Sequence, residues 1–141
     1  MLHRHFGIYA IIASSDNQKI LLIEKARGPY EGRFDLPGGS IENTELLEEC
    51  LAREIKEETG CEIVNFKQIE TISSFFDYQN SNQENCCLRH IGVLYQAEIS
   101  GIPKSHGDGE DSNGCIWRDI NSLDSSNSTP FVLWAINYLK Q

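Results

Sequence analysis

Residues 39–61 read GSIENTELLEECLAREIKEETGC, and this stretch decides how the rest of the chain is interpreted. Apolar residues recur in it at the three- and four-residue spacing of an amphipathic helix. The pattern predicts a helix over residues 45–59, with Asn43 or Thr44 as its N-cap. Gly60 follows directly and is the residue at which we expect the helix to end.

The six glutamates of the predicted helix divide between its two sides on a helical wheel drawn at about 100° per residue. One group shares the side of the apolar stripe and consists of Glu54, Glu57 and Glu58. The other group lies on the opposite side and is explained as an ordinary solvated face: Glu45, Glu48 and Glu49. A solvated face therefore accounts for only half of these carboxylates.

The three glutamates on the apolar side need a counter-charge. Carboxylates one turn apart repel one another and are costly to remove from water. A raised pKa or a bound cation relieves this cost, and hard carboxylate oxygens suit Mg²⁺ or Mn²⁺. Arg53 lies one turn before Glu57 and is placed to orient it, but one arginine cannot neutralise three carboxylates. The sequence therefore predicts a metal site on this helix.

The net charge of −9 is concentrated around the same helix. Residues 42–62 hold eight Glu against one Arg and one Lys, a local net charge of −6. So acidic a chain lacks the basic surface that nucleic-acid polymers and anionic membranes require, and we expect neither as a partner. An anionic phosphate substrate would need a cation between itself and this protein.

The start of the chain permits two interpretations. Basic residues 3–5 followed by apolar residues 6–13 loosely imitate a signal peptide. We prefer a buried first strand, because the polar turn at residues 14–17 leads directly into a second apolar run, as in a β-hairpin. No apolar run approaches the roughly 18 residues of a membrane span. The five cysteines, odd in number and without C-x-x-C spacing, indicate reduced thiols in a cytoplasmic protein.

Strands and helices are expected to alternate along the chain. The predicted strands, the third of them broken, cover residues 6–13, 20–24, 63–78, 87–99 and 115–117. A second helix is predicted to begin at Thr129-Pro130, where a capping residue precedes a proline. The whole chain, residues 1–141, therefore reads as one α/β domain with a mixed central sheet and helices on its faces. The polar, glycine-rich stretch 100–114 is long enough to be either functional or mobile.

Residues 39–61 also resemble the signature of the Nudix hydrolase family, G-x5-E-x7-R-E-U-x-E-E-x-G-U, in which U is a bulky apolar residue. All seven fixed positions match, and the preceding Leu36-Pro37-Gly38 also looks like the family. Cys61 departs from the pattern, which prefers a larger aliphatic residue there. The resemblance implies an α/β/α sandwich that hydrolyses a nucleoside diphosphate linked to another group.

The resemblance also implies a role for each motif residue. It assigns metal coordination to the backbone carbonyl of the first residue and three carboxylates: Gly39, Glu54, Glu57 and Glu58. Glu45 would support the site from behind the ligands, and Arg53 would hold a glutamate in its orientation. Glu54 is our first choice as general base. Glu110, in the acidic stretch 107–111, is the alternative, although a solvated turn explains that stretch equally well.

Candidate substrate-binding residues lie outside the motif. Lys25, Arg27 and Tyr30 are suited to binding phosphates and stacking a base, and an exposed turn explains them equally well. Tyr78 follows Cys61 by 17 residues, an offset at which some diadenosine-polyphosphate-cleaving relatives stack a tyrosine on the nucleobase. The four histidines show no ligand spacing, and the sequence assigns them no role.

We therefore expect a metal-dependent pyrophosphohydrolase that uses Mg²⁺ or Mn²⁺ and an activated water. The substrate is expected to be a small nucleotide-containing diphosphate, with a slight tilt towards nucleoside triphosphates or dinucleoside polyphosphates. The alternative is a module of the same fold that senses a nucleotide without cleaving it. The intact motif argues against that alternative, because a module freed from catalysis need not keep three metal-facing glutamates and Arg53. A homodimer is a further expectation from the resemblance.

Overall fold

The computed structural model of the chain describes residues 1–105 and 112–141. Its larger sheet has the strand order β4-β1-β6-β5. The strands of this sheet are β1 (Leu2–Ile11), β4 (Gly38–Gly39), β5 (Ile63–Gln79) and β6 (Asn85–Ile99). β1 and β6 run parallel, whereas the other two pairings are antiparallel, so the sheet is mixed as expected.

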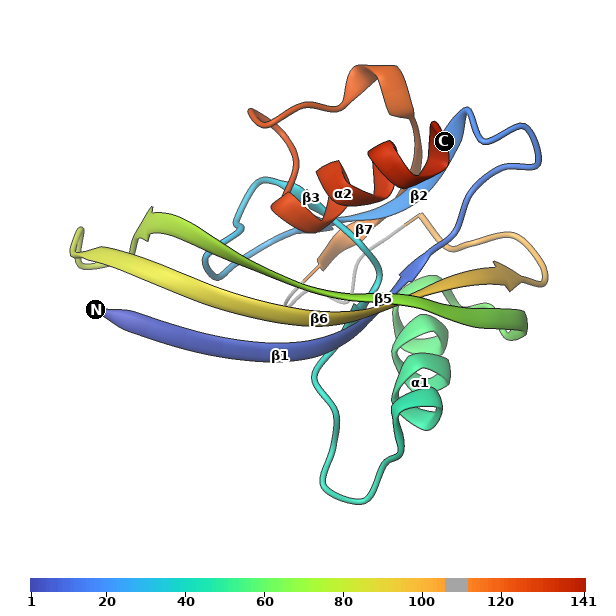
Figure 1. Cartoon of the computed structure of the whole chain (residues 1–141), viewed down its shortest axis with the longest axis horizontal. Coiled ribbons are helices and arrows are strands. Elements are labelled where there is room, and N and C mark those ends of the chain that lie inside the picture. The colour runs from blue at the N-terminus through green and yellow to red at the C-terminus, as the bar shows by residue number, and fades with distance from the viewer. Residues whose placement is uncertain (106–111) are drawn as a thin grey trace.

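A smaller antiparallel sheet has the order β3-β2-β7. Its strands are β2 (Lys19–Lys25), β3 (Phe34–Asp35) and β7 (Ser112–Asp119). The helical elements are α1 (Leu47–Thr59), the short 3-10 helix η1 (Ile120–Ser122) and α2 (Pro130–Leu139). Figure 1 shows α1 on one side of the strands and α2 on the other. The predicted α/β/α sandwich is therefore confirmed, with a middle layer of two sheets.

The strands at the centre of the middle layer are buried on both faces. Ile8 of β1 and Leu21 of β2 pack towards Leu51 of α1. Ile11 and Leu22 belong to the core on the other side, against α2. Consecutive apolar residues in β1 and β2 are thus required, because alternate side chains enter different cores.

The predicted hairpin is only partly correct. The turn at residues 14–17 exists, and the chain returns antiparallel through a single bridge between Ala13 and Ile20. Beyond that bridge the two strands separate into different sheets, because β1 pairs along its whole length with β6 whereas β2 pairs with β7. β5, expected to be broken, is continuous and absorbs its irregularity in two register shifts.

Helix α1 begins at Leu47, later than predicted, and neither Asn43 nor Thr44 caps it. The Glu49 carboxylate instead accepts a hydrogen bond from the backbone N–H of Leu46 at 2.8 Å, which satisfies a donor of the first turn. The predicted end is confirmed: Gly60 adopts a left-handed conformation with φ of 78°.

Helix α2 begins where the sequence predicts. Thr129 is its N-cap, accepting a hydrogen bond from the N–H of Val132, and Pro130 is its first residue. All five cysteines carry free thiols. Within residues 1–105 and 112–141, none of the helices has the length and apolar composition needed to cross a membrane.

Candidate active site

A cavity of about 690 Å³ lies where the large sheet, the β2–β3 connection, β4 and α1 meet. It is lined by all the metal and substrate residues predicted within the described chain: Lys25, Arg27, Tyr30, Gly39, Glu54, Glu57, Glu58 and Tyr78. Of two further cavities, the one of about 670 Å³ is lined by Tyr78 alone of this set. The one of about 760 Å³ is lined by none of these residues. The first cavity has the volume of an ordinary small-molecule site, and we take it as the candidate active site.

The glycine pair of β4 brings backbone and carboxylates into close contact. The backbone N–H of Gly38 donates to Glu58 Oε1 at 2.6 Å. A Cβ at Gly38, whose φ is 144°, would lie 2.1 Å from the backbone oxygen of Ile8. A Cβ at Gly39 would lie 2.7 Å from Glu54 Oε1. Gly38 must therefore be glycine for β4 to pack against β1, whereas a side chain at Gly39 would displace the Glu54 carboxylate.

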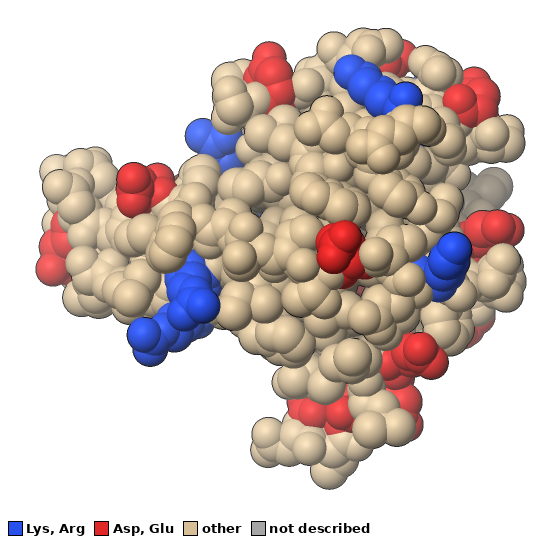
Figure 2. Space-filling view, in the orientation of Figure 1, with Lys and Arg blue, Asp and Glu red and all other residues tan. Residues whose placement is uncertain are grey.

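The three glutamates on the cavity side of α1, Glu54, Glu57 and Glu58, form what we call the carboxylate wall. Arg53 is the one cation that forms ion pairs with it among the described residues. Its Nη1 lies 3.0 Å from Glu54 and 3.4 Å from Glu57. Figure 2 shows further acidic side chains gathered at the lower end of the molecule, over α1.

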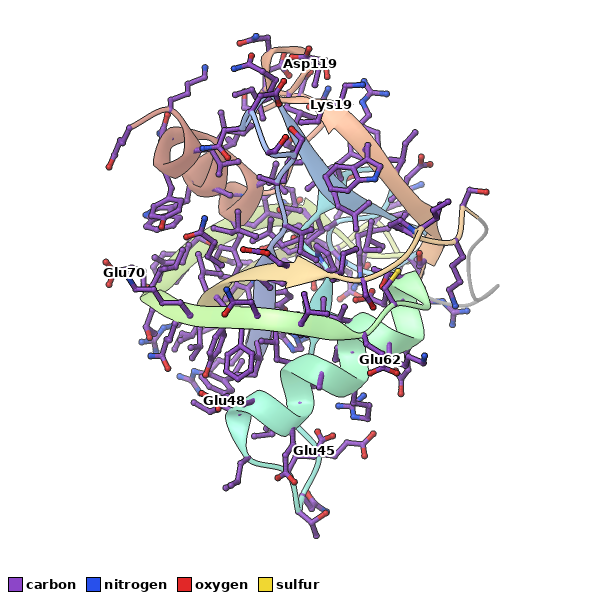
Figure 3. The ribbon with its side chains drawn as sticks, turned by 90° about the vertical axis from the view of Figure 1, so that its right-hand side faces the viewer. Lys19, Glu45, Glu48, Glu62, Glu70 and Asp119 are labelled. Carbon is purple, nitrogen blue, oxygen red and sulfur yellow. The ribbon has the colours of Figure 1, made fainter. Side chains whose placement is uncertain are left out.

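The other side of Arg53 is bound to Glu45. The two side chains form a two-pronged ion pair, with Nε at 2.5 Å and Nη2 at 2.9 Å from the carboxylate. These hydrogen bonds lower the pKa of Glu45 to about 2. Glu45 precedes the helix and is only 13% exposed, so the wheel was wrong to place it among the solvated charges. Figure 3 shows Glu45 on the loop that leads into α1 and Glu48 on the helix itself.

Burial and mutual repulsion leave part of the carboxylate wall short of positive charge. The pKa of Glu54 is raised, first by burial and further by Glu57, although Arg53 opposes the shift. The pKa of Glu58 is raised well above its ordinary value by burial, and the neighbouring Glu54 adds to the effect. The charged forms of these adjacent carboxylates are therefore disfavoured, chiefly because the side chains are buried away from water.

The wall is not a finished metal site in this conformation. Across residues 1–105 and 112–141, no three His, Cys, Asp or Glu side chains converge closely enough to hold an ion. Glu54 and Glu57 turn towards Arg53, and Glu58 accepts from Gly38. The donor chemistry nevertheless fits Mg²⁺ or Mn²⁺, because three carboxylates and a backbone carbonyl are hard oxygen ligands.

Cationic side chains face the same cavity from the β2–β3 side. Lys25, at the end of β2, lowers the pKa of both Glu58 and Asp35, so it lies close to both carboxylates. Within the described chain Lys25 forms no ion pair. Arg27 lies two residues further on, exposed at the cavity edge. Lys25 is therefore available to an anionic ligand inside the cavity.

The two predicted tyrosines differ in exposure. Tyr30 is only 4% exposed, its ring lies edge-on to Phe76 at 4.9 Å, and its hydroxyl is 2.9 Å from His90 Nδ1. Tyr78 is half-buried, with its ring centroid 6.3 Å from that of His3. Tyr78 thus has a more accessible ring than Tyr30 for stacking on a planar group.

Sequence reasoning missed several residues of this cavity, above all the histidines. His3 and His5 alternate along β1 and therefore share a face, and His90 pairs in register with His5 on the adjacent strand. His90 is 1% exposed, and its pKa is lowered to about 3 by burial, then by His5 and Lys25. The i, i+2 spacing of His3 and His5 was a signal that they share one face of a strand. Glu110 lies outside the described residues.

Comparison with known proteins agrees with this geometry. The NUDIX domain profile matches residues 1–140. An ADP-ribose pyrophosphatase of Methanocaldococcus jannaschii is 34% identical over 122 residues, which are 86% of this chain and 66% of that protein. The chain therefore spans about two thirds of that relative.

Solved structures show the same fold. A MutT NUDIX hydrolase from Burkholderia pseudomallei superposes with a TM-score of 0.74 at 24% identity, over 96% of this chain and 97% of the other. The NUDIX domain of Shewanella oneidensis NrtR, solved in complex with ADP ribose, gives a TM-score of 0.69 at 21% identity, over 97% and 86% of the two chains. Fold, motif geometry and profile agree, and the chain belongs to the NUDIX domain family.

Proposed function

We propose that this protein hydrolyses a phosphoanhydride bond in a nucleoside diphosphate linked to a further group, using Mg²⁺ or Mn²⁺. The observation that carries the proposal is one cavity that combines the carboxylate wall with Lys25 and Arg27. Carboxylates without a cation repel a diphosphate, whereas carboxylates holding a cation attract it. The lysine and arginine then suit the remaining phosphate oxygens.

In this proposal Glu54, Glu57, Glu58 and the carbonyl of Gly39 hold the metal. A divalent cation bound there would neutralise phosphate oxygens and lower the pKa of an attacking water. Arg53 keeps Glu54 and Glu57 in place, because it is itself fixed on Glu45 and on the backbone oxygen of Ser40. The role proposed for Glu45 is therefore to hold Arg53, at one remove from the substrate.

Glu54 is the general base that we propose. Burial and its acidic neighbours raise its pKa, which brings the carboxylate closer to the range in which it accepts a proton efficiently near neutral pH. Glu110 stays the alternative base named from the sequence. Substituting Glu110 separates them, because turnover stays unchanged if Glu54 is the base and falls if Glu110 is.

The substrate we propose to test first is ADP-ribose, because the M. jannaschii relative is named an ADP-ribose pyrophosphatase. Tyr78 is the residue proposed to stack on the base, and Tyr30 to line the cavity beneath it. Nucleoside triphosphates and dinucleoside polyphosphates, favoured by the position of Tyr78 in the sequence, are the second group to test.

The setting that we infer is cytoplasmic, from five free thiols, and a homodimer stays a prediction that light scattering checks. Small nucleotides, rather than nucleic-acid polymers or membranes, are the partners that the net charge of −9 favours.

A phosphate-release and product assay tests the proposed function. The panel contains nucleoside triphosphates, dinucleoside polyphosphates, ADP-ribose and nucleotide sugars, each with Mg²⁺, with Mn²⁺ and with EDTA. We expect cleavage of at least one class, only in the presence of metal. Binding of a nucleotide without any cleavage would favour the nucleotide-sensing alternative instead.

A further inference from the structure

Helix α1 covers only part of its side of the large sheet. Ile8 of β1 packs towards α1. Because side chains alternate along a strand, the even-numbered residues that precede it, Leu2, Arg4 and Phe6, share that side. Figure 1 shows α1 against one half of β1, β5 and β6, while the half that begins at the N-terminus has none of the described helices on this side. A face that is buried under α1 is therefore exposed further along the same strands.

The neighbouring strands extend this exposed surface. Arg4 pairs in register with Arg89 of β6, and Arg89 pairs with Phe75 of β5. Phe6 pairs with Ile91 of β6. We call six residues the open face: Leu2, Arg4, Phe6, Phe75, Arg89 and Ile91. Of these, Leu2, Phe6 and Phe75 are 51%, 42% and 69% exposed. Exposed apolar side chains gathered on one face are typical of a surface that binds a partner.

The open face also carries unbalanced positive charge. Arg4 and Arg89 lie directly opposite each other on adjacent strands, where like charges repel. Both are exposed, and within residues 1–105 and 112–141 neither forms an ion pair. A negative surface placed against them would remove the repulsion. The open face therefore suits a partner surface that is both apolar and acidic.

The chain itself carries a surface of that kind, where the loop after β4 enters α1. Residues 41–49, which we call the α1 tip, hold four Glu and no Lys or Arg. Ile41 and Leu47 pack against the core, whereas Leu46 between them is 74% exposed. Glu42 and Glu49 are exposed as well. The α1 tip is therefore an outward apolar side chain accompanied by carboxylates.

The open face and the α1 tip lie on the same side of the large sheet. Figure 1 shows the tip extending away from the strands, next to the half that α1 leaves uncovered. Figure 2 shows basic side chains below that half and acidic side chains around α1. A two-fold axis between two copies can bring each tip onto the open face of the other, and it makes the two contacts identical.

We propose that the open face is the interface for a second copy of this chain. Leu46 of each copy packs on the apolar side chains of the other copy's open face, and the acidic tip faces Arg4 and Arg89. The open face extends only roughly 16 Å along β1, so we expect a weak dimer with a Kd of roughly 10 µM. The inference goes beyond the proposed hydrolysis and does not depend on it.

Sedimentation velocity between about 1 and 300 µM, without metal or nucleotide, tests the association. The wild type should change from monomer to dimer over this range. Leu46→Glu and Arg89→Glu should each raise Kd at least about 10-fold, because each places a carboxylate where an apolar contact or a positive charge is needed. Ile102→Glu is the matched control, since Ile102 is 94% exposed and belongs to neither surface. It should leave Kd within about twofold.

Cross-linking between unlike chains tests the geometry. One chain carries Leu46→Cys and an affinity tag, and a second, untagged chain carries Phe75→Cys. The mixture is oxidised with diamide. We expect a disulfide-linked product of one tagged and one untagged chain, which has to form between copies. The control mixture pairs Phe75→Cys with Ile102→Cys, contains the same five native thiols, and should give no such product above the wild-type background.

Four results would overturn the inference. They are a wild type that stays monomeric at 300 µM, equal losses in Leu46→Glu and Ile102→Glu, a dimer without the Leu46→Cys to Phe75→Cys link, and wild-type binding to anionic vesicles that Arg89→Glu abolishes. The last would assign the open face to a membrane. Melting temperatures of the variants should agree to within a few degrees, which excludes unfolding as the cause. Failure of the proposed hydrolysis is seen separately, because association is measured without substrate.

Discussion

The carboxylate wall and a ring cluster of Tyr9, Tyr30, His90 and Phe131, the first three of which line the same cavity, are built in opposite ways. The wall comes from neighbouring residues of α1, whereas the ring cluster joins Tyr9 and Tyr30 to His90 across 81 and 60 residues of sequence. In the wall, burial raises the pKa of two carboxylates that lack sufficient positive charge. In the ring cluster, both nitrogens of a neutral imidazole are paired.

In the proposed function, the two regions have different tasks. In the proposed function, a cation gains binding energy on the buried carboxylates of the wall, and the chemistry takes place there. Complete hydrogen bonding makes the ring cluster rigid and leaves its imidazole without a free donor or acceptor. Changes in the wall should therefore act on turnover, and changes in the ring cluster on stability and affinity.

Glu57→Gln should have the largest effect, and it tests the difference between the two regions most clearly. We expect turnover to fall roughly 10³-fold, because the wall loses one of its three charged metal ligands. The fold should persist, since the Glu57 side chain is 58% exposed. Steady-state kinetics with Mg²⁺ checks this, with Glu48→Gln on the same helix as the matched control. Full activity in Glu57→Gln would show that the carboxylate wall takes no part in the chemistry.

Arg53→Lys tests whether the wall must be held as well as charged. A lysine keeps the charge but cannot bind Glu45 with two prongs while also reaching Glu54. We expect turnover to fall by about 10- to 100-fold at an unchanged melting temperature to within a few degrees. Lys56→Arg, one turn from the helix end and exposed, is the control that should be neutral. Equal turnover in wild type and Arg53→Lys would mean that charge alone suffices.

Comparison with His90→Gln should show that the neutral, buried imidazole makes the wild type less stable in acid. The unfolded chain binds a proton at His90 below a pH of about 6.5, whereas the folded chain does so only near a pKa of about 3, because burial, His5 and Lys25 oppose the charge. Wild type should therefore lose about 2 kcal/mol more than His90→Gln between pH 7 and pH 5. Urea unfolding at both values measures this. Parallel losses in the two proteins would contradict a neutral, buried imidazole.

Metal binding should give the smallest effect, a moderate rise in melting temperature. At ten times Kd a ligand adds about 1.4 kcal/mol to the stability of the folded state, which is a rise of a few degrees for a chain of this length. Glu57→Gln should abolish the rise, whereas Tyr30→Phe should retain it, because the ring cluster holds no metal. A thermal scan with Mg²⁺ or Mn²⁺ that shows no shift in wild type would argue against a metal on the wall.

The carboxylate wall was predictable from sequence because its three residues lie close together along the chain. Glu54, Glu57 and Glu58 lie within one helix, so a helical period places them together. The start of that helix was mispredicted. Glu45 lies before the helix and forms an ion pair with Arg53, which helix propensities do not describe. The end of the helix was predicted correctly, because it depends only on the left-handed conformation of Gly60 itself.

The ring cluster was not predictable in the same way. Its contacts depend on parallel pairing of β1 with β6, a long-range register that periodicity does not give. Gly7 and Gly92, which leave room for the rings of Tyr9 and Phe131, carry no signal separately, and they matter only because the register places them side by side. The divergence of β1 and β2 into two sheets was missed for the same reason, since the turn between them is local whereas their partners are distant.

The most direct test of the central claim is product analysis of ADP-ribose hydrolysis by the wild-type chain, first in EDTA and then after addition of Mg²⁺. If ADP-ribose is not cleaved in the panel, the best substrate of the panel takes its place. We predict no cleavage in EDTA and the release of two monophosphate products on addition of metal, with Glu57→Gln inactive under both conditions. Equal cleavage with and without metal, or a fully active Glu57→Gln, would contradict hydrolysis by a metal on the carboxylate wall.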